Sequence, residues 1–241
     1  MLAKKSIKAT TVIFAVITII VFGFIKTNTS LVQIGDRIAY NASKQLNESK
    51  IEYIKVSRKE GYSEEYYRDM KNLKERSDIK DENGNLVNRI LVLEEGKRII
   101  NIGNENGKVE VHTWLLPDEI AKANKEILSK SIQENIKNSL KNQKWTLEGN
   151  IELSNGKKAK KISSLIDGFC EVVYVDEETD FPIKREIYEV QEDGGKKLKL
   201  IEERAEEYKK IDDDSNQLFE YEQYELEEIP APVEGNEVGK G

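Results

Sequence analysis

Cysteine and histidine are almost absent from the chain, which has one of each, Cys170 and His112, among 241 residues. One cysteine cannot form an intramolecular disulfide, and a zinc site built from Cys and His needs more ligands than these two. Cys170 lies in the run GFCEVV, where a small buried hydrophobe is the favoured interpretation, and His112 lies in the strand-like run VEVHTWLL. Because neither residue has a partner that would activate it, the sequence argues against nucleophilic catalysis.

Catalytic and metal-binding motifs are missing as well, since the chain has no G-x-S-x-G, no H-E-x-x-H and no phosphate-binding glycine loop. Asp212, Asp214 and Asn216 have the spacing of a calcium loop, but Gln217 stands where the turn needs glycine and Gln223 where a bidentate Glu is needed. With 45 Asp and Glu in the chain, neighbouring carboxylates are expected and identify no acid–base pair. We therefore expect no catalytic residue, no metal and no cofactor, and no enzymatic activity.

The chain also lacks a surplus of basic charge. Its formal net charge is −7, and its 38 Lys and Arg residues are for the most part interleaved with acidic ones. A surface that binds phosphate groups needs clustered Lys and Arg. The composition therefore argues against nucleic acid as a partner.

One long hydrophobic run is present, at residues 9–25, and it follows a basic segment at residues 1–8. Its length is near the lower limit for a transmembrane helix, and the positive charge before it places the N-terminus in the cytoplasm. The sequence after it offers no A-x-A-like cleavage site and no cysteine for lipidation. We expect a single-pass anchor in the cell membrane, a linker at residues 26–33 and an extracytoplasmic domain at residues 34–229, with a cleaved signal as the alternative. Residues 230–241, rich in Pro, Gly and Glu, are expected to be a disordered tail.

Within the domain, the hydrophobic period changes three times. Residues 34–46 carry an apolar residue at every fourth position, which predicts a helix. From residue 51 to 116 the period is two, and Asn83-Gly84, Glu95-Gly96 and Asn106-Gly107 separate the runs YYRDMKNLKERSDI, LVNRILVLEE, KRIINI and KVEVHTWLL. Asn-Gly favours a type I′ hairpin turn, so these runs predict a meander of strands.

Residues 118–143 carry the longest helical pattern, with Asp118 as the expected N-cap, and it fits one helix or two with a bend. Strands are expected again from Trp145, with a turn at Asn155-Gly156, and residues 172–188, VVYVDEETDFPIKREIY, predict a strand, a turn and a strand. The run LFEYEQYELEEI, with three aromatic residues, suggests a closing strand.

These elements predict an α+β fold in which a curved antiparallel sheet, an incomplete barrel, has helices on its concave face and one transmembrane helix before it. The apolar stripe of the 118–143 helix and the apolar side of the strand before it are the expected lining of a ligand groove. That lining consists of Ile120, Ile127, Leu128, Ile132, Ile136, Leu140, Val109, Val111 and Leu115.

Residues 172–188 also carry a resemblance to a known family. The pattern V-x-V-D-x-x-T-x-x-P-x-[KR], present here as Val173, Val175, Asp176, Thr179, Pro182 and Lys184, is similar to a stretch of the LolA-like, or lipoprotein-carrier, superfamily. The order of elements resembles that family over residues 34–229. The resemblance implies a curved, incomplete antiparallel barrel that binds acyl chains, lipoproteins or partner proteins. The expected anchor departs from the soluble carriers, and the Ile-, Lys-, Asn- and Glu-rich composition suggests a low-GC Gram-positive bacterium, where similar proteins include germination lipoproteins. Those proteins are lipidated, and this chain lacks the cysteine that would carry the lipid.

Two functions follow from this interpretation. The first is a membrane-anchored extracytoplasmic binding module that holds a lipid-like chain or a lipoprotein segment in its groove. The second is a scaffold or chaperone for a cell-envelope or spore-cortex enzyme, with a role in sporulation or germination. The expected partners are thus the cytoplasmic membrane, through the N-terminal helix, and a hydrophobic ligand or an envelope protein. A homodimer is left open.

Overall fold

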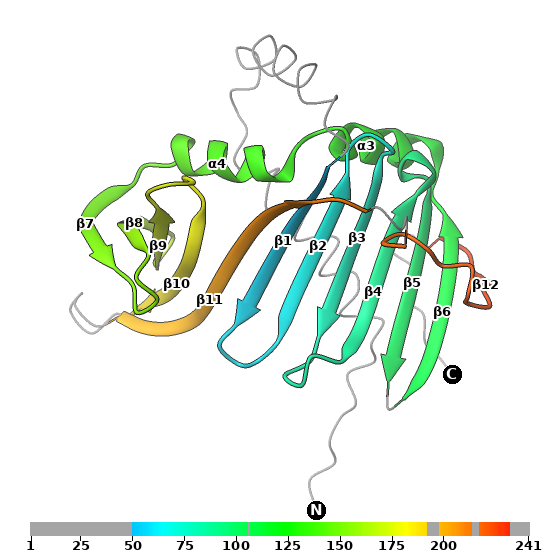
Figure 1. The fold of residues 1–241 in the computed structure, drawn as a ribbon, viewed down its shortest axis with the longest axis horizontal. Coiled ribbons are helices and arrows are strands. Elements are labelled where there is room, and N and C mark those ends of the chain that lie inside the picture. Colours follow the sequence, from blue (N-terminus) through cyan, green and yellow to red (C-terminus); the bar gives the residue numbers. More distant parts are fainter. Residues whose placement is uncertain (1–49, 106, 192–197, 214–216, 232–241) are drawn as a thin grey trace, which may run out of the picture. The chain divides into compact units, whose positions relative to one another are not determined.

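The computed structural model of the protein describes residues 50–105, 107–191, 198–213 and 217–231, and the strands of this part form one sheet (Figure 1). Twelve strands follow one another in the order β12-β6-β5-β4-β3-β2-β1-β11-β10-β9-β8-β7, and they are antiparallel except that β12 runs parallel to β6. The sheet is curved and does not close, and two helices accompany it, which confirms the predicted α+β fold. The helices expected at residues 9–25 and 34–46 lie outside the described residues. None of the described helices is both long and apolar enough to cross a membrane.

The first six strands form the predicted meander. They are β1 (Ile51–Arg58), β2 (Ser63–Asp69), β3 (Lys74–Lys80), β4 (Leu86–Leu93), β5 (Arg98–Glu105) and β6 (Lys108–Leu115). Because side chains alternate along a strand, the cross-strand register sorts them onto two sides of the sheet. Tyr67, Leu91 and Ile100 lie in one cross-strand row on what we call the front face. Glu52 and Arg68, which face each other across β1 and β2, belong to the back face.

The turns of the meander differ in detail from the prediction. Residues 66–79 form two strands, β2 and β3, where the sequence suggested one run, and Leu73 in the turn between them has a φ of 52°. The β3–β4 hairpin is confirmed, with Gly84 at a φ of 82°. Asn83 is not among the described residues with positive φ, so the expected type I′ turn is wrong. The loop is wider because the Asp81 carboxylate accepts hydrogen bonds from the amides of Asn83 and Asn85, at 2.9 and 2.8 Å.

The helical pattern at residues 118–143 forms two helices, α3 (Asp118–Leu128) and α4 (Ile132–Asn142). The expected N-cap at Asp118 is wrong, because Pro117 occupies that position without a side-chain hydrogen bond. The break comes at Ser131, whose side chain accepts a hydrogen bond from the Glu134 amide and thereby caps α4. The Glu52 carboxylate of the back face accepts the Ile132 amide at 2.8 Å, so β1 holds the start of α4.

The remaining strands form the second half of the sheet. They are β7 (Thr146–Glu152), β8 (Lys158–Ile166), β9 (Phe169–Asp176), β10 (Pro182–Val190) and β11 (Leu198–Ile211). The hairpin predicted at residues 172–188 is confirmed as β9 and β10. Asp176 forms its turn by accepting the amides of Glu178 and Thr179, and buried Pro182 begins β10.

Strand β11 joins the two halves. Its residues Arg204–Ile211 pair with β1, whereas its residues Leu198–Ala205 pair with β10. The two pairings share Arg204 and Ala205, so the sheet passes from one half to the other within two residues. Figure 1 shows β11 as a long bent strand between them.

The chain after β11 departs most from the prediction. The run LFEYEQYELEEI was expected to be a closing strand, but its strand, β12, is limited to Glu227–Glu228. The rest turns twice, with hydrogen bonds from the Glu220 amide to the Gln217 carbonyl and from the Tyr224 amide to the Tyr221 carbonyl. We call residues 218–229 the strap, because this segment crosses the strands of the meander before it reaches β6 (Figure 1).

Candidate binding surface

The centre of the front face is charged. Asp78 on β3 and Arg89 on β4 are cross-strand partners, and Arg76 lies two residues before Asp78 on the same face. The Asp78 carboxylate accepts hydrogen bonds from Arg89 Nε and Nη2 at 2.8 and 2.9 Å and from Arg76 Nε at 2.9 Å. Its side chain is fully buried. Burial alone raises the pKa of Asp78, but the hydrogen bonds and positive charges of the two arginines outweigh it and hold that pKa below its usual value.

A second carboxylate lies beside this centre. Glu65 on β2 is the cross-strand partner of Asp78, and it accepts hydrogen bonds from Lys80 Nζ and from the Tyr67 hydroxyl, both at 2.8 Å. Burial raises the pKa of Glu65. The hydrogen bonds from Lys80 and Tyr67 and the charge of Lys55 lower that pKa by more than burial raises it, so the net shift is downward. The front face therefore combines buried charges with the apolar row around them.

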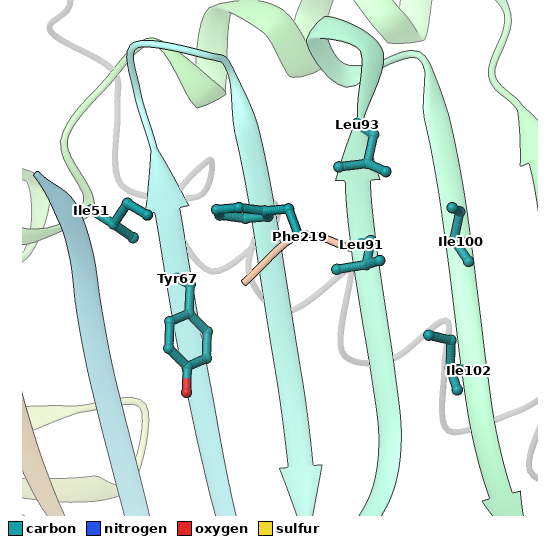
Figure 2. Packing of buried hydrophobic residues seen from close by; sticks show 7 residues of the cluster. All are labelled: Ile51, Tyr67, Leu91, Leu93, Ile100, Ile102 and Phe219. Atoms are coloured by element: carbon teal, nitrogen blue, oxygen red, sulfur yellow. The ribbon is translucent and has the colours of Figure 1, made fainter. Parts of the chain in front are cut away.

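The strap covers this face with its apolar side chains. Phe219, which is buried, joins Tyr67, Leu91 and Ile100 in one cluster, and Figure 2 shows it lying over the strands among them. Other strap residues packed against the cluster are Leu218, Tyr221, Tyr224 and Leu226. Arg76 Nη1 donates a hydrogen bond to the Leu218 carbonyl at 2.9 Å, which ties the strap to the charged centre.

A cleft of about 550 Å³ opens between the strap and one edge of the meander, where β2 turns into β3 and β4 ends. The sheet contributes Asp69, Asn72, Lys74, Leu93, Glu94 and Glu95 to its lining, and the chain after β11 contributes Asp213, Phe219, Glu220, Tyr221 and Glu222. Most of these side chains are charged or polar, and the aromatic ring of Phe219 lies among them. Lys74 Nζ is 5.9 Å from the centre of that ring, within the range of a cation–π contact.

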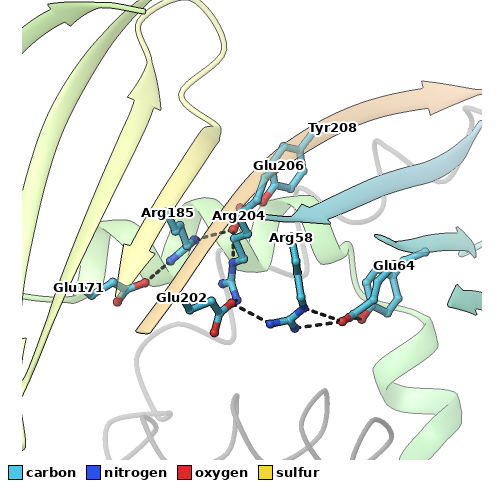
Figure 3. Close-up of polar contacts among 9 residues, drawn as sticks. Arg58, Glu64, Glu171, Arg185, Glu202, Arg204, Glu206 and Tyr208 are labelled. Carbon is cyan, nitrogen blue, oxygen red and sulfur yellow. Dashed lines mark hydrogen bonds and ion pairs between the residues drawn. The ribbon is translucent and has the colours of Figure 1, made fainter. Parts of the chain in front are cut away.

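The back face carries a ladder of charges across the join of the two halves (Figure 3). Arg58 on β1 binds Glu64 and Glu202, and Glu206 on β11 accepts from Arg185 Nε at 2.8 Å and from Arg204 Nε at 2.9 Å. Burial lowers the pKa of the Arg185 guanidinium, but the charges of Glu206 and Glu171 outweigh it, so the net direction is up. With its charges paired inside the ladder, this face offers a stabilising network rather than a reactive group.

The helix residues expected to line a groove lie in several environments. Leu128 is buried, Ile120 is 49% exposed, and Ile127, Ile132, Ile136 and Leu140 are partly buried. The junction of α3 and α4 contacts the back face, where the Arg68 guanidinium donates to the carbonyls of Ile127 and Lys130 at 3.2 and 3.0 Å.

The strand residues of that expected groove lie elsewhere. Val111 belongs to the front face and packs against the cluster that contains Phe219. Val109 and Leu115 share its side of β6 by alternation and are exposed, at 50% and 39%. Val111 and the α3–α4 junction thus lie on opposite faces of the sheet, so these two parts of the expected lining do not share one groove.

The single cysteine and histidine have defined surroundings. Cys170 is partly buried, and burial and the negative charge of Glu148 raise the pKa of its thiol, which disfavours the reactive thiolate. His112 Nδ1 lies 3.5 Å from Glu227 Oε2, at the pairing of β6 with β12. No group of three or more His, Cys, Asp or Glu that could hold a metal ion occurs within the described ranges. Of the calcium-like triplet, Asp214 and Asn216 lie outside those ranges.

Sequence reasoning missed the charged centre and the strap. A signal for the centre exists, because R-S-D in Arg76–Asp78 puts opposite charges two positions apart on one face of a strand. Its partner Arg89 could not be identified before the register was known. The strap gave a misleading signal, since its aromatic and acidic residues are spaced much like those of an edge strand.

Comparisons with known proteins add no family. No family model matches the chain, and no curated protein matches it either. Among solved structures, an uncharacterized conserved protein from Thermus thermophilus is 16% identical with a TM-score of 0.41, over 82% of this chain and 100% of that one. MucB in complex with MucA(peri) is 13% identical with a TM-score of 0.32, over 70% and 54%. A domain described as an outer membrane lipoprotein-sorting protein from Vibrio parahaemolyticus is 12% identical with a TM-score of 0.27, over 68% and 73%. At these scores the similarities carry no argument about function.

Proposed function

We propose that the chain is a membrane-anchored, extracytoplasmic module that binds a segment of another cell-envelope protein. The observation that carries this proposal is the cleft between the meander and the strap, with its polar and charged lining around Phe219. A peptide presents amides and carbonyls that need polar partners, and such a lining supplies them beside an aromatic contact. An acyl chain would leave most of these groups without partners in a desolvated site. As proposed, the module catalyses no reaction and acts as a scaffold or chaperone for an envelope or spore-cortex enzyme.

The membrane part of the proposal rests on the sequence of residues 1–25, where a basic segment precedes an uncharged run. It is tested by replacing exposed Asn72 with cysteine in a Cys170→Ser chain and adding a membrane-impermeant maleimide to intact cells. We expect labelling of Asn72→Cys without lysis. Labelling that requires lysis would refute the extracytoplasmic placement.

Partner binding is tested by photo-crosslinking in cells that produce the full chain. A benzophenone amino acid at Asn72, an exposed position on the sheet side of the cleft, is compared with the same probe at Glu119, an exposed position at the start of α3 that does not line the cleft. We expect one reproducible protein adduct from position 72 and none from position 119. Equal adducts at the two positions would contradict a specific partner at the cleft.

A lipid-like ligand is the second candidate, and one surface patch favours it. Six apolar side chains at the end of β8–β11 are at least 38% exposed: Leu165, Ile166, Phe169, Leu198, Leu200 and Ile201. Leu165 and Ile166 are adjacent in β8 and therefore point to opposite faces, so the end of the sheet is apolar on both sides. Mass spectrometry of lipids extracted from the purified chain distinguishes the candidates. A stoichiometric lipid that is lost in a Leu165→Ser, Phe169→Ser variant would favour the lipid over the protein segment.

A further inference from the structure

The strap is attached to the sheet in a different way from the strands. Its main-chain link to β6 is the two-residue pairing of Glu227 and Glu228 with His112 and Thr113, followed by a hydrogen bond from the Ile229 amide to the Thr113 carbonyl at 2.9 Å. Each antiparallel pair of the meander, in contrast, extends over six to eight residues. Side chains rather than a ladder of main-chain hydrogen bonds therefore hold most of the strap.

The strap is both acidic and aromatic. Residues 218–229 contain five glutamates and no basic residue. The surface beneath is mixed in charge: Arg76 and Arg89 are paired with the buried Asp78, whereas Lys74 lies near Phe219 of the strap. A backbone bond holds the pKa of Glu222 below its usual value, and the charge of Lys74 adds to this effect. The strap thus shows in its own sequence the kind of chain that this surface accepts, with aromatic side chains over the apolar cluster and a glutamate near Lys74.

The strap fills its site incompletely. The cleft of about 550 Å³ lies directly beside Phe219, Tyr221 and Glu222, so the contact between strap and sheet is open on that side. Beyond the pairing at His112 and Thr113, the outer edge of β6 has no described strand beside it at its other positions. A longer strand could therefore pair with β6 where the strap uses two residues.

We propose that the strap is an internal ligand, and that the front face beneath it is a docking groove for an acidic, aromatic segment of a partner protein whose end adds a parallel strand to β6. This inference rests on the proposed function in taking the partner to be a protein segment. The tethered strap competes with the partner at an effective concentration in about the millimolar range, so the partner must bind well or the strap must be weakened. The groove is open to the partner when the strap has moved away.

The test uses the full chain and a labelled peptide with the sequence of residues 217–229. Fluorescence anisotropy measures peptide binding to the wild-type chain and to the Phe219→Ala variant, whose own strap has lost its buried aromatic anchor. We expect at least a tenfold lower apparent Kd for the variant. The matched control is Gln223→Ala, an exposed strap position that does not line the cleft, and it should bind the peptide as the wild-type chain does. A peptide with alanine in place of Phe219 should bind neither chain. A Phe219→Ala chain that unfolds cooperatively but binds the peptide no more tightly than the wild type overturns the proposal.

A second measurement keeps the proposal falsifiable if Phe219→Ala does not fold. Hydrogen exchange of the wild-type chain compares the amides of Tyr224 and Ile229 with those of Leu91 and Ile100 in the meander. We expect the strap amides to exchange at least tenfold faster, because the strap opens without unfolding of the sheet. Equal rates would make the strap a fixed part of the core and overturn the proposal.

The source of the partner segment is tested separately. A concentration-dependent dimer of the wild-type chain in sedimentation would assign the groove to the strap of a second copy and overturn the assignment to a different protein. Failure of the peptide experiment leaves the crosslink from position 72 unaffected. Loss of that crosslink with intact peptide binding would instead contradict the proposed function.

Discussion

Removal of the charge of Asp78 should destabilise the protein more than any similar change at its surface. In the Asp78→Asn variant, the guanidinium groups of Arg76 and Arg89 lose their shared carboxylate while they remain only 12% and 17% exposed. Removing one partner of a buried ion pair costs about 3–5 kcal/mol, because the remaining charge is left without compensation. The whole domain is expected to be stable by about 5–15 kcal/mol. The substitution therefore removes a large part of the free energy of unfolding.

Thermal denaturation followed by circular dichroism measures this loss. For a domain of this size each kcal/mol shifts the melting temperature by about 2–4 °C, so the expected decrease is about 6–20 °C. The matched control is Asp118→Asn, which removes the same charge from a side chain that is 90% exposed and 3.0 Å from Lys97 Nζ. Such a surface pair contributes below about 1 kcal/mol. If Asp78→Asn lowered the melting temperature no more than Asp118→Asn does, the reasoning about the buried centre would be refuted.

Three further changes test other parts of the structure. The bonds and charges around Glu65 hold its pKa below the unfolded value of about 4.3, so its contribution to stability is present above that pH and is lost as the pH falls through the lower folded pKa. Urea denaturation should therefore show the free energy of unfolding decreasing as the pH is lowered below about 4.3; a constant value would contradict this. Gly96→Ala should cost at least about 1 kcal/mol more of the free energy of unfolding than Gly84→Ala. Both glycines have positive φ, but an added Cβ at Gly96 would lie 2.7 Å from a side-chain carbon of α3, whereas one at Gly84 would meet nothing within 4 Å. Equal denaturation midpoints for the two variants would exclude the steric contact. Glu52→Ala should lower the free energy of unfolding by about 1–3 kcal/mol in the same assay, because the first amides of α4 lose a buried acceptor. Glu52→Gln should lower it less, because those amides keep a neutral acceptor.

Local signals in the sequence were enough to predict most strands and turns. The β9–β10 hairpin could be predicted because Asp176 forms its turn through its own neighbours and Pro182 fixes the start of the next strand. The helical pattern at residues 118–143 was also correct in type, and Ser131 with Glu134 explains its division into two helices. These features depend on residues within a few positions of one another.

The candidate site could not be predicted, because it depends on register and on a long-range contact. Asp78 meets Arg89 only through the pairing of β3 with β4, and Arg76 reaches the strap across 142 positions of sequence, at Leu218. The expected groove assumed that the apolar stripe from Ile120 to Leu140 and the apolar side of β6 face each other. In the structure the α3–α4 junction contacts the back face of β1 and β2, whereas Val111 lies on the front face. A one-dimensional pattern gives the period of an element but does not identify the element that covers it.

The narrow join at β11 also has a consequence for how the chain folds. Within each half of the sheet, neighbouring strands are neighbours in sequence and close short loops, whereas the pairing of β1 with β11 brings together residues about 150 positions apart. Since long loops cost more entropy before their contacts form, we expect the two halves to assemble first and separately, and β11 to unite them last. The strap follows β11 in the chain and so reaches a meander that is already complete. Synthesis would thus present the bare front face to other segments of protein before the chain supplies its own.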